Sequence, residues 1–149
     1  MRVGEVCNRE VVVISREATL LEAAKLMRSQ HVGTVVVADE QDGNSIPVGI
    51  LTDRDMVIAL IAEEVPLNAV SVGDVMSPEL IIARESDGLF ETVEHMRDRG
   101  VRRLPVVAEN GSLVGILAVD DVLDLLAEQL TSLVKLVACE RRREEQRRA

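Results

Sequence analysis

Short β-branched runs alternate with amphipathic stretches along the chain, and turn-forming residues separate them. Residues 11–14 (VVVI) have the length and composition of a buried strand. Thr19 and Glu22 form a capping-box pattern before a stretch whose apolar residues recur on one helix face. The Asp42-Gly43 pair is typical of a tight hairpin. The first half therefore predicts a strand at 11–14, a helix from residue 20, strands at 35–38 and 46–51, and a helix at about 53–62.

The second half of the chain repeats the pattern of the first. Leu20 corresponds to Leu89 at an offset of 69 residues. Val48 corresponds to Val114 at an offset of 66, because the hairpin loop is longer in the first half. An offset that changes only within a turn indicates two copies of one folded unit. The second copy predicts a strand at 80–83, a helix at 89–99, strands at 104–107 and 113–117, and a helix from about residue 120.

Each copy is therefore expected to be a β-α-β-β-α unit, and the fold class is α/β (α+β). With both helices on one face, each sheet leaves its other face apolar and uncovered. The two sheets are then expected to pack face to face around an approximate twofold axis. Such packing creates two equivalent clefts where the copies meet. Residues 71–78, which include Gly73 and Pro78, link the two copies.

Composition narrows the range of functions. The 149 residues carry a formal net charge of −9, which opposes binding to nucleic acid and to anionic membranes. One Phe and no Trp or Tyr provide no aromatic platforms for stacking bases. Two distant cysteines, Cys7 and Cys139, and two histidines match neither a zinc site nor a catalytic triad, so we expect no metal and no enzymatic activity. The chain shows neither a signal-peptide pattern nor a membrane-spanning run, which favours a cytoplasmic protein.

A family resemblance rests on the duplication together with two short motifs. Residues 49–55 (GILTDRD) fit a glycine–hydrophobic–x–Thr/Ser–x–x–Asp signature, and residues 101–106 (VRRLPV) form the second motif. The chain resembles a tandem pair of CBS domains, named after cystathionine β-synthase and often called a Bateman module. The resemblance implies a stand-alone regulatory protein with repeats at 5–66 and 71–138 and a charged C-terminal end at 139–149.

The resemblance also implies a ligand and partners. The ligand is an adenosine-containing small molecule bound between the repeats: AMP, ADP or ATP, and with less support NAD or S-adenosylmethionine. No cofactor is required. Modules of this kind commonly pair into a flat four-unit disk, so a homodimer is expected, together with an effector protein of unknown identity. The alternative function is a structural dimerisation module with vestigial clefts.

The first expected cleft joins the end of a strand in the first copy to strands of the second. Thr52 and Asp55 fit a simple capping box, but the same geometry also places a hydroxyl, unpaired backbone N–H groups and a carboxylate where they suit a phosphate and a ribose. Arg102 and Arg103 have two interpretations. They are either a solvated pair of charges, or one of them places its guanidinium in the cleft, because neighbouring residues on a strand point to opposite faces. The resemblance implies that residues of both copies form one ligand site, in which apolar side chains lie beside the adenine. The residues of this site are Thr52, Asp53, Asp55, Leu80, Ile81, Val101, Arg102 and Arg103.

The second expected cleft departs from this pattern. Ala118 stands where the first copy has Thr52, and Gly33-Thr34 replace the two arginines, whereas Asp121 keeps the place of the carboxylate. We therefore expect weak binding, a ligand with less phosphate, or no ligand. The residues that the resemblance assigns to this cleft are Val11, Val12, Val32, Gly33, Thr34 and Asp121.

The last predicted helix continues towards the chain end with apolar residues at helical spacing. Its final turns, residues 140–148, are rich in Arg and Glu with a net positive charge. One interpretation is a solvated helix end with alternating ion pairs. The other is that residues 130–137 form a dimer seam.

Overall fold

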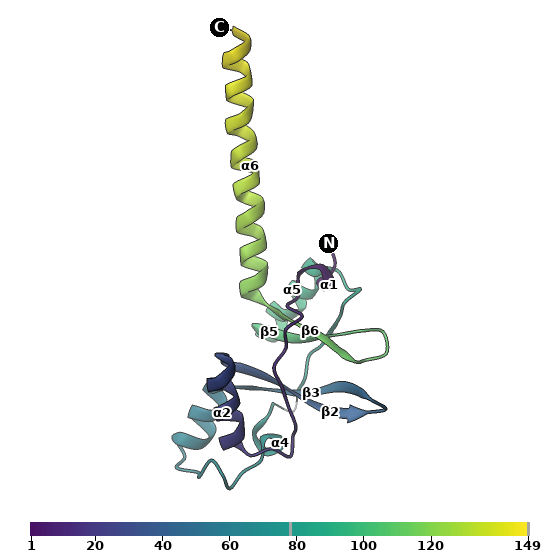
Figure 1. The fold of residues 1–149 in the computed structure, drawn as a ribbon, viewed down its shortest axis with the longest axis vertical. Helices are drawn as coiled ribbons and strands as arrows, with labels where there is room; N and C mark the ends of the chain where they lie inside the picture. The colour runs from purple at the N-terminus through teal and green to yellow at the C-terminus, as the bar shows by residue number, and fades with distance from the viewer. Residues whose placement is uncertain (78, 149) are drawn as a thin grey trace.

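Two three-stranded sheets form the centre of the protein, one from each half of the chain (Figure 1). The computed structural model describes residues 1–77 and 79–148, so Pro78 of the predicted linker lies outside the described residues. In each sheet the first strand runs parallel to the middle strand, which pairs antiparallel with the third. The strands are β1 (Val13–Ile14), β2 (Thr34–Gln41) and β3 (Asn44–Thr52) in one sheet, and β4 (Ala83–Arg84), β5 (Arg103–Val107) and β6 (Leu113–Ala118) in the other.

The sheets face each other, with β3 in contact with β6, and the helices lie on their outer sides (Figure 1). The predicted duplication, the α/β fold class and the stacking of sheet on sheet are therefore confirmed. The hairpin between β2 and β3 turns at Asp42 and Gly43, both with positive φ, as the Asp-Gly pair predicts. The helices are α1 (Val3–Val6), α2 (Leu20–Gln30), α3 (Asp53–Met56) with the π-helix η1 (Val57–Ile61), α4 (Val72–Val75), α5 (Leu89–Arg99) and α6 (Val119–Arg148).

Local sequence explains where the two matching helices begin and end. The Thr19 hydroxyl accepts from the Glu22 N–H at 3.1 Å, and the Glu22 carboxylate accepts from the Thr19 N–H at 2.8 Å, which completes the predicted capping box of α2. α5 ends at Gly100, whose φ of 66° lies in the left-handed region. α2 ends in the same conformation at His31, with a φ of 56°. The two helices therefore have the same length and the same kind of end.

The first strand of each sheet is shorter than predicted. Only Val13 and Ile14 of the predicted 11–14 strand pair with β2, and β4 begins at Ala83 instead of residue 80. Val11 and Val12 line the second cleft, and Leu80 and Ile81 line the first. The Val12 carbonyl still accepts the Val36 N–H at 2.9 Å, just before β1 begins. The predicted 53–62 helix also divides into α3 and η1.

The four-residue helices α1 and α4 each pack on one unit, although the other unit follows them in sequence. Val3 of α1 and Cys7 lie in the core of the second unit, and the Val3 and Gly4 N–H groups bond to carbonyls of residues 85–87, each at 2.9 Å. Val72 of α4 lies in the core of the first unit, and its N–H donates to the Ala18 carbonyl at 2.8 Å. Burial raises the pKa of the Cys7 thiol, which keeps that side chain protonated. The chain therefore crosses between the units twice, near residues 8–12 and near residues 79–82.

Candidate functional site

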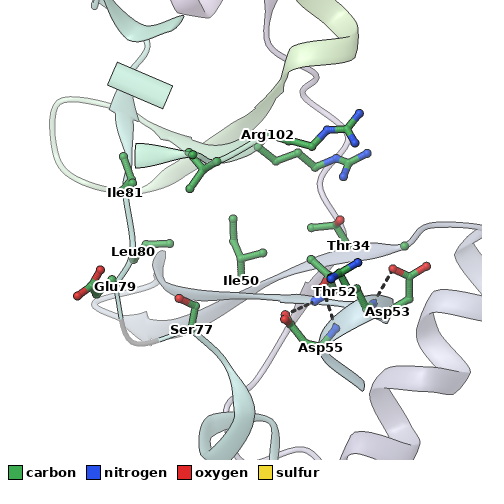
Figure 2. A pocket seen from close by; sticks show the side chains of 15 residues that line it. Thr34, Ile50, Thr52, Asp53, Asp55, Ser77, Glu79, Leu80, Ile81 and Arg102 are labelled. Atoms are coloured by element: carbon green, nitrogen blue, oxygen red, sulfur yellow. Dashed lines mark hydrogen bonds between the residues drawn. The ribbon is translucent and has the colours of Figure 1, made fainter. Parts of the chain in front are cut away.

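The first cleft is a cavity of about 560 Å³ between the two units (Figure 2). Its floor is the end of β3 with the start of α3, and its opposite wall is the segment around residues 79–81 together with the start of β5. All eight residues predicted for this cleft line it: Thr52, Asp53, Asp55, Leu80, Ile81, Val101, Arg102 and Arg103.

Thr52 and Asp55 form the capping box that their spacing predicts. The Thr52 hydroxyl accepts from the Asp55 N–H at 3.1 Å, and Asp55 Oδ2 accepts from the Thr52 N–H at 2.9 Å. Among the described residues, no hydrogen bond uses Asp55 Oδ1. The cap fixes the orientation of the carboxylate and leaves one oxygen available to a ligand.

The backbone N–H groups at the start of α3 are not available to a phosphate, contrary to the prediction. The Asp53 N–H donates to the Gly33 carbonyl at 2.9 Å, and the Arg54 N–H donates to Asp53 Oδ1 at 2.8 Å. The Asp55 N–H is taken by Thr52. Neighbouring side chains and the carbonyl of Gly33, just before β2, satisfy the donors of the first turn. Any phosphate in the cleft therefore depends on side-chain cations.

Both adjacent arginines line the cleft, whereas strand alternation predicted only one of them there. The difference arises because β5 begins at Arg103, so Arg102 precedes the strand and is free of its alternation. The Arg102 guanidinium lies 3.7 Å from Asp120, and both side chains are largely exposed, which makes this a weak pair. Figure 2 shows Arg102 across the cavity from Thr52 and Asp55. With Arg54, three guanidinium groups and three carboxylates line this cleft.

Glycine at position 33, directly before β2, allows the backbone to approach the start of α3 closely. A Cβ built on Gly33 would lie 2.9 Å from Asp53 Oδ2, closer than real contacts allow. The Gly33 carbonyl also accepts the Asp53 N–H. A larger residue there would therefore displace the Asp53 side chain from the cleft.

The second cleft is smaller, with a volume of about 340 Å³, and lies on the other side of the same contact between the units. Here the Ala118 N–H donates to Asp121 Oδ2 at 3.3 Å, but the residue offers no hydroxyl in return, so the capping box is incomplete. Three carboxylates, Glu10, Asp120 and Asp121, face one guanidinium, that of Arg103. All six predicted residues line this cleft: Val11, Val12, Val32, Gly33, Thr34 and Asp121.

Within residues 1–77 and 79–148, no group of three or more His, Cys, Asp or Glu side chains could hold a metal ion. In the part of the chain that the structure describes, no helix combines the length and the apolar composition needed to cross a bilayer.

The sequence model of the CBS domain matches residues 3–62 and 72–128, that is, both halves of the duplication. The chain belongs to the CBS domain family. An uncharacterized protein of Methanopyrus kandleri, MK0525, is 39% identical over 123 residues, which are 83% of this chain and 61% of that protein. This chain therefore spans less than two thirds of the length of that relative.

Solved structures of other CBS proteins share the fold. PAE2072 from Pyrobaculum aerophilum, a CBS domain protein solved in complex with AMP, is 27% identical with a TM-score of 0.72, over 81% of this chain and 89% of that chain. The CBS domain pair of MJ0100, solved with 5′-methylthioadenosine and S-adenosyl-L-methionine, is 21% identical with a TM-score of 0.74, over 87% of this chain and 98% of that chain. The second comparison bears on the fold alone.

The two clefts of this CBS pair share a wall. Gly33, Thr34 and Arg103 line both cavities, although the first two were assigned only to the second cleft and Arg103 only to the first. The shared wall follows from the stacking of the sheets, since β2 and β5 are the middle strands of the two CBS repeats.

Several residues of the CBS clefts were not predicted. Ile50 could have been found from strand periodicity, because it lies two residues before Thr52 on the same face of β3. Arg54 lies inside the recognised motif. In the second cleft the repeat and strand periodicity could likewise have indicated Val36, Ile116 and Ala118, since Ala118 takes the place of Thr52 and Ile116 that of Ile50. His31 directly precedes Val32, which was predicted. No sequence pattern marked the remaining cleft residues, which are Ser77, Glu79 and Gly100 in the first cleft and Asn8, Glu10 and Asp120 in the second.

Proposed function

We propose that this CBS pair is a non-catalytic regulatory module that binds an adenine nucleotide in the first cleft. The observation that carries the proposal is the meeting of Asp55, from one repeat, with Arg102 and Arg103, from the other, around one cavity. A volume of about 560 Å³ also lies within the range of roughly 300–1,000 Å³ that small-molecule sites occupy.

The chemistry of the lining residues suits the parts of a nucleotide. Asp55 Oδ1 accepts from the ribose hydroxyls, as acidic residues do in dinucleotide sites. The guanidinium groups of Arg102, Arg103 and Arg54 bind phosphate, because their planar forks match its oxygens. The adenine packs against aliphatic side chains, chiefly Leu80 and Ile81. AMP, ADP and ATP fit this description better than NAD or S-adenosylmethionine.

Regulation follows from the position of the cleft between the repeats. A ligand that contacts both repeats favours the arrangement in which both sets of contacts form, and only such differential binding can shift a conformational equilibrium. The proposed output is a change in affinity for an effector protein, and the proposed assembly is a homodimer. The complex of a related CBS protein with AMP supports the ligand class.

The alternative function is a structural dimerisation module whose clefts no longer bind a ligand. The incomplete capping box at Ala118 and the acidic lining of the second cleft favour this alternative for that cleft. The first cleft keeps its carboxylate and its cations, and so the nucleotide-binding proposal is the stronger one.

The test is a calorimetric titration with AMP, ADP, ATP, NAD and S-adenosylmethionine, followed by Asp55→Ala. Hydrogen bonds to a charged group contribute about 1.5–3 kcal/mol, so the variant should lose roughly tenfold to more than a hundredfold in affinity. Because Asp55 also caps α3, the control is Asp74→Ala, which removes the same kind of cap from α4 at an exposed position. Absence of binding by all five ligands would favour the dimerisation module.

A further inference from the structure

The C-terminal helix α6 extends well beyond the rest of the molecule (Figure 1). Val122 is its only buried residue within the described chain, and Leu125 packs partly against the second core. From residue 126 to residue 148 every position is exposed. The projecting part, residues 126–148, has no packing partner in this chain, although most helical stability in proteins comes from tertiary contacts.

Five of the exposed apolar residues of α6 follow a coiled-coil period, and Val134 and Leu136 lie beside them. Leu123, Leu126, Leu130, Leu133 and Val137 are separated by three and four residues in turn, which is the spacing of a and d positions. Their exposed fractions lie between 46% and 63%. Five such residues make a continuous stripe about 21 Å long at 1.5 Å per residue. A stripe with this period is suited to another helix, and we call these five residues the α6 seam.

Charge along α6 indicates that the other helix is a second copy in the opposite direction. The first turns are acidic, with Asp120, Asp121, Asp124 and Glu128, and the last turns are rich in arginine. The next two positions in the three–four progression of the α6 seam are Glu140 and Glu144. In a parallel pair, each of these glutamates would face its own copy, and like charges at core positions repel.

An antiparallel pair removes this repulsion and matches the charges. If Leu130 opposes the partner's Leu133, then Leu126 opposes the partner's Val137 and Glu140 moves to the end of the seam. In this register Asp120 lies beside the partner's Arg141, and the twofold axis produces the same pair at the other end. Flanking positions of opposite charge stabilise and orient coiled coils.

We propose that two copies of this chain associate through an antiparallel pairing of their α6 seams. The simpler interpretation of a solvated helix end accounts for the last turns, where Arg148 and Glu144 form a pair at 2.8 Å. It does not account for five large apolar residues in a three–four repeat just before them. The proposal identifies a surface for the homodimer and is independent of ligand binding in the clefts.

Sedimentation equilibrium of the full chain tests the pairing. Leu130→Glu with Leu133→Glu puts charges in the α6 seam and should halve the mass from dimer to monomer. Thr131→Glu with Ser132→Glu adds the same charge on the opposite side of the helix and should leave the dimer intact. AMP affinity measured on each variant shows separately whether the cleft is functional. A monomeric unmodified chain at tens of micromolar, or a dimer that persists in the Leu130→Glu, Leu133→Glu variant, would overturn the proposal.

Disulfide cross-linking tests the direction. In a Cys139→Ser background, Leu126→Cys and Val137→Cys are made as separate chains and oxidised alone or mixed. The antiparallel register predicts covalent dimers only in the mixture, because Leu126 opposes the partner's Val137. Efficient cross-linking of Leu126→Cys with itself would indicate a parallel pair and contradict the proposed direction. The circular dichroism spectrum of each variant before oxidation confirms that α6 is intact.

Discussion

The charged residues of the first cleft are held in place by contacts that they already make inside the protein. One oxygen of Asp55 caps α3, and one oxygen of Asp53 holds the Arg54 N–H. Gly33 leaves room for Asp53 and accepts its backbone N–H. The carboxylate side of the cleft is therefore ordered before any ligand arrives, which reduces the entropy lost on binding. The arginine side is different, since Arg102 makes one long contact with Asp120 and is largely exposed.

The arginines are predicted to recognise phosphate and not the nucleoside. Arg102→Gln and Arg103→Gln should each weaken AMP binding by roughly tenfold or more, because each removes a charge-assisted hydrogen bond of about 1.5–3 kcal/mol. Binding of adenosine should change by less than threefold. Titration calorimetry with the two ligands measures the difference.

Arg28→Gln is the matched control for these two variants. It removes the same charge from an exposed position on α2, outside both clefts, and should leave both affinities unchanged. If the Arg102 and Arg103 variants lost affinity for adenosine and AMP equally, these side chains would not be the ones that bind phosphate. A further check is salt, because added salt should weaken AMP binding more than adenosine binding.

At the level of elements, the two crossings of the chain bind the units together. α1 completes the core of the second unit and α4 completes that of the first. The crossing after α1 lines the second cleft with Asn8, Glu10, Val11 and Val12. The crossing after α4 lines the first cleft with Ser77, Glu79, Leu80 and Ile81. The exchange of short helices thus places the cleft walls and joins two units that each have their own core.

This exchange predicts where a core mutation loosens the structure. Val3 and Val72 are both fully buried, and replacing either with Ala should lower the free energy of unfolding by about 2 kcal/mol. In Val3→Ala, amide hydrogen exchange should rise most in β5 and β6, although residue 3 precedes the first unit in sequence. In Val72→Ala it should rise most in β2 and β3. The observed packing would be contradicted if exchange rose mainly in β2 and β3 for Val3→Ala, or mainly in β5 and β6 for Val72→Ala. Equal increases in both sheets would contradict it as well.

Elements with a long periodic signal were predictable from sequence, and elements held by the other unit were not. α5 covers the predicted residues 89–99, because its apolar face repeats over three turns and Gly100 marks its end. The four-residue helices α1 and α4 have too few turns for a periodic pattern. Residues 11–12 and 80–82 have strand composition but lie between the units, and only the tertiary structure determines that choice.

The same distinction holds for the clefts. Residues in the two motifs were predicted to converge, and the structure brings them together. The phosphate role predicted for the α3 backbone was wrong, because side chains and the Gly33 carbonyl already satisfy those N–H groups. A sequence indicates which groups stand near a helix start, but not which of them are already hydrogen-bonded.

For the whole molecule, duplication provides two clefts of the same origin but different charge. The first has as many guanidinium groups as carboxylates, whereas the second has three carboxylates and one guanidinium. Placing a phosphate in the second cleft would bring it near Glu10, Asp120 and Asp121. Because Arg103 lines both cavities, a nucleotide in the first cleft also competes for the one cation of the second.

We therefore expect one AMP per chain in calorimetric titrations, and at about 100 times the dissociation constant a gain of roughly 2.7 kcal/mol in stability. For a protein of this size the gain corresponds to a rise in the melting temperature of roughly 5–10 °C, measured by circular dichroism.

Glu10→Gln combined with Ala118→Thr removes one carboxylate from the second cleft and restores the hydroxyl that its capping box lacks. The double variant should show a second, weaker AMP site. Two equal sites in the unmodified chain would mean that the charge difference between the clefts does not control binding.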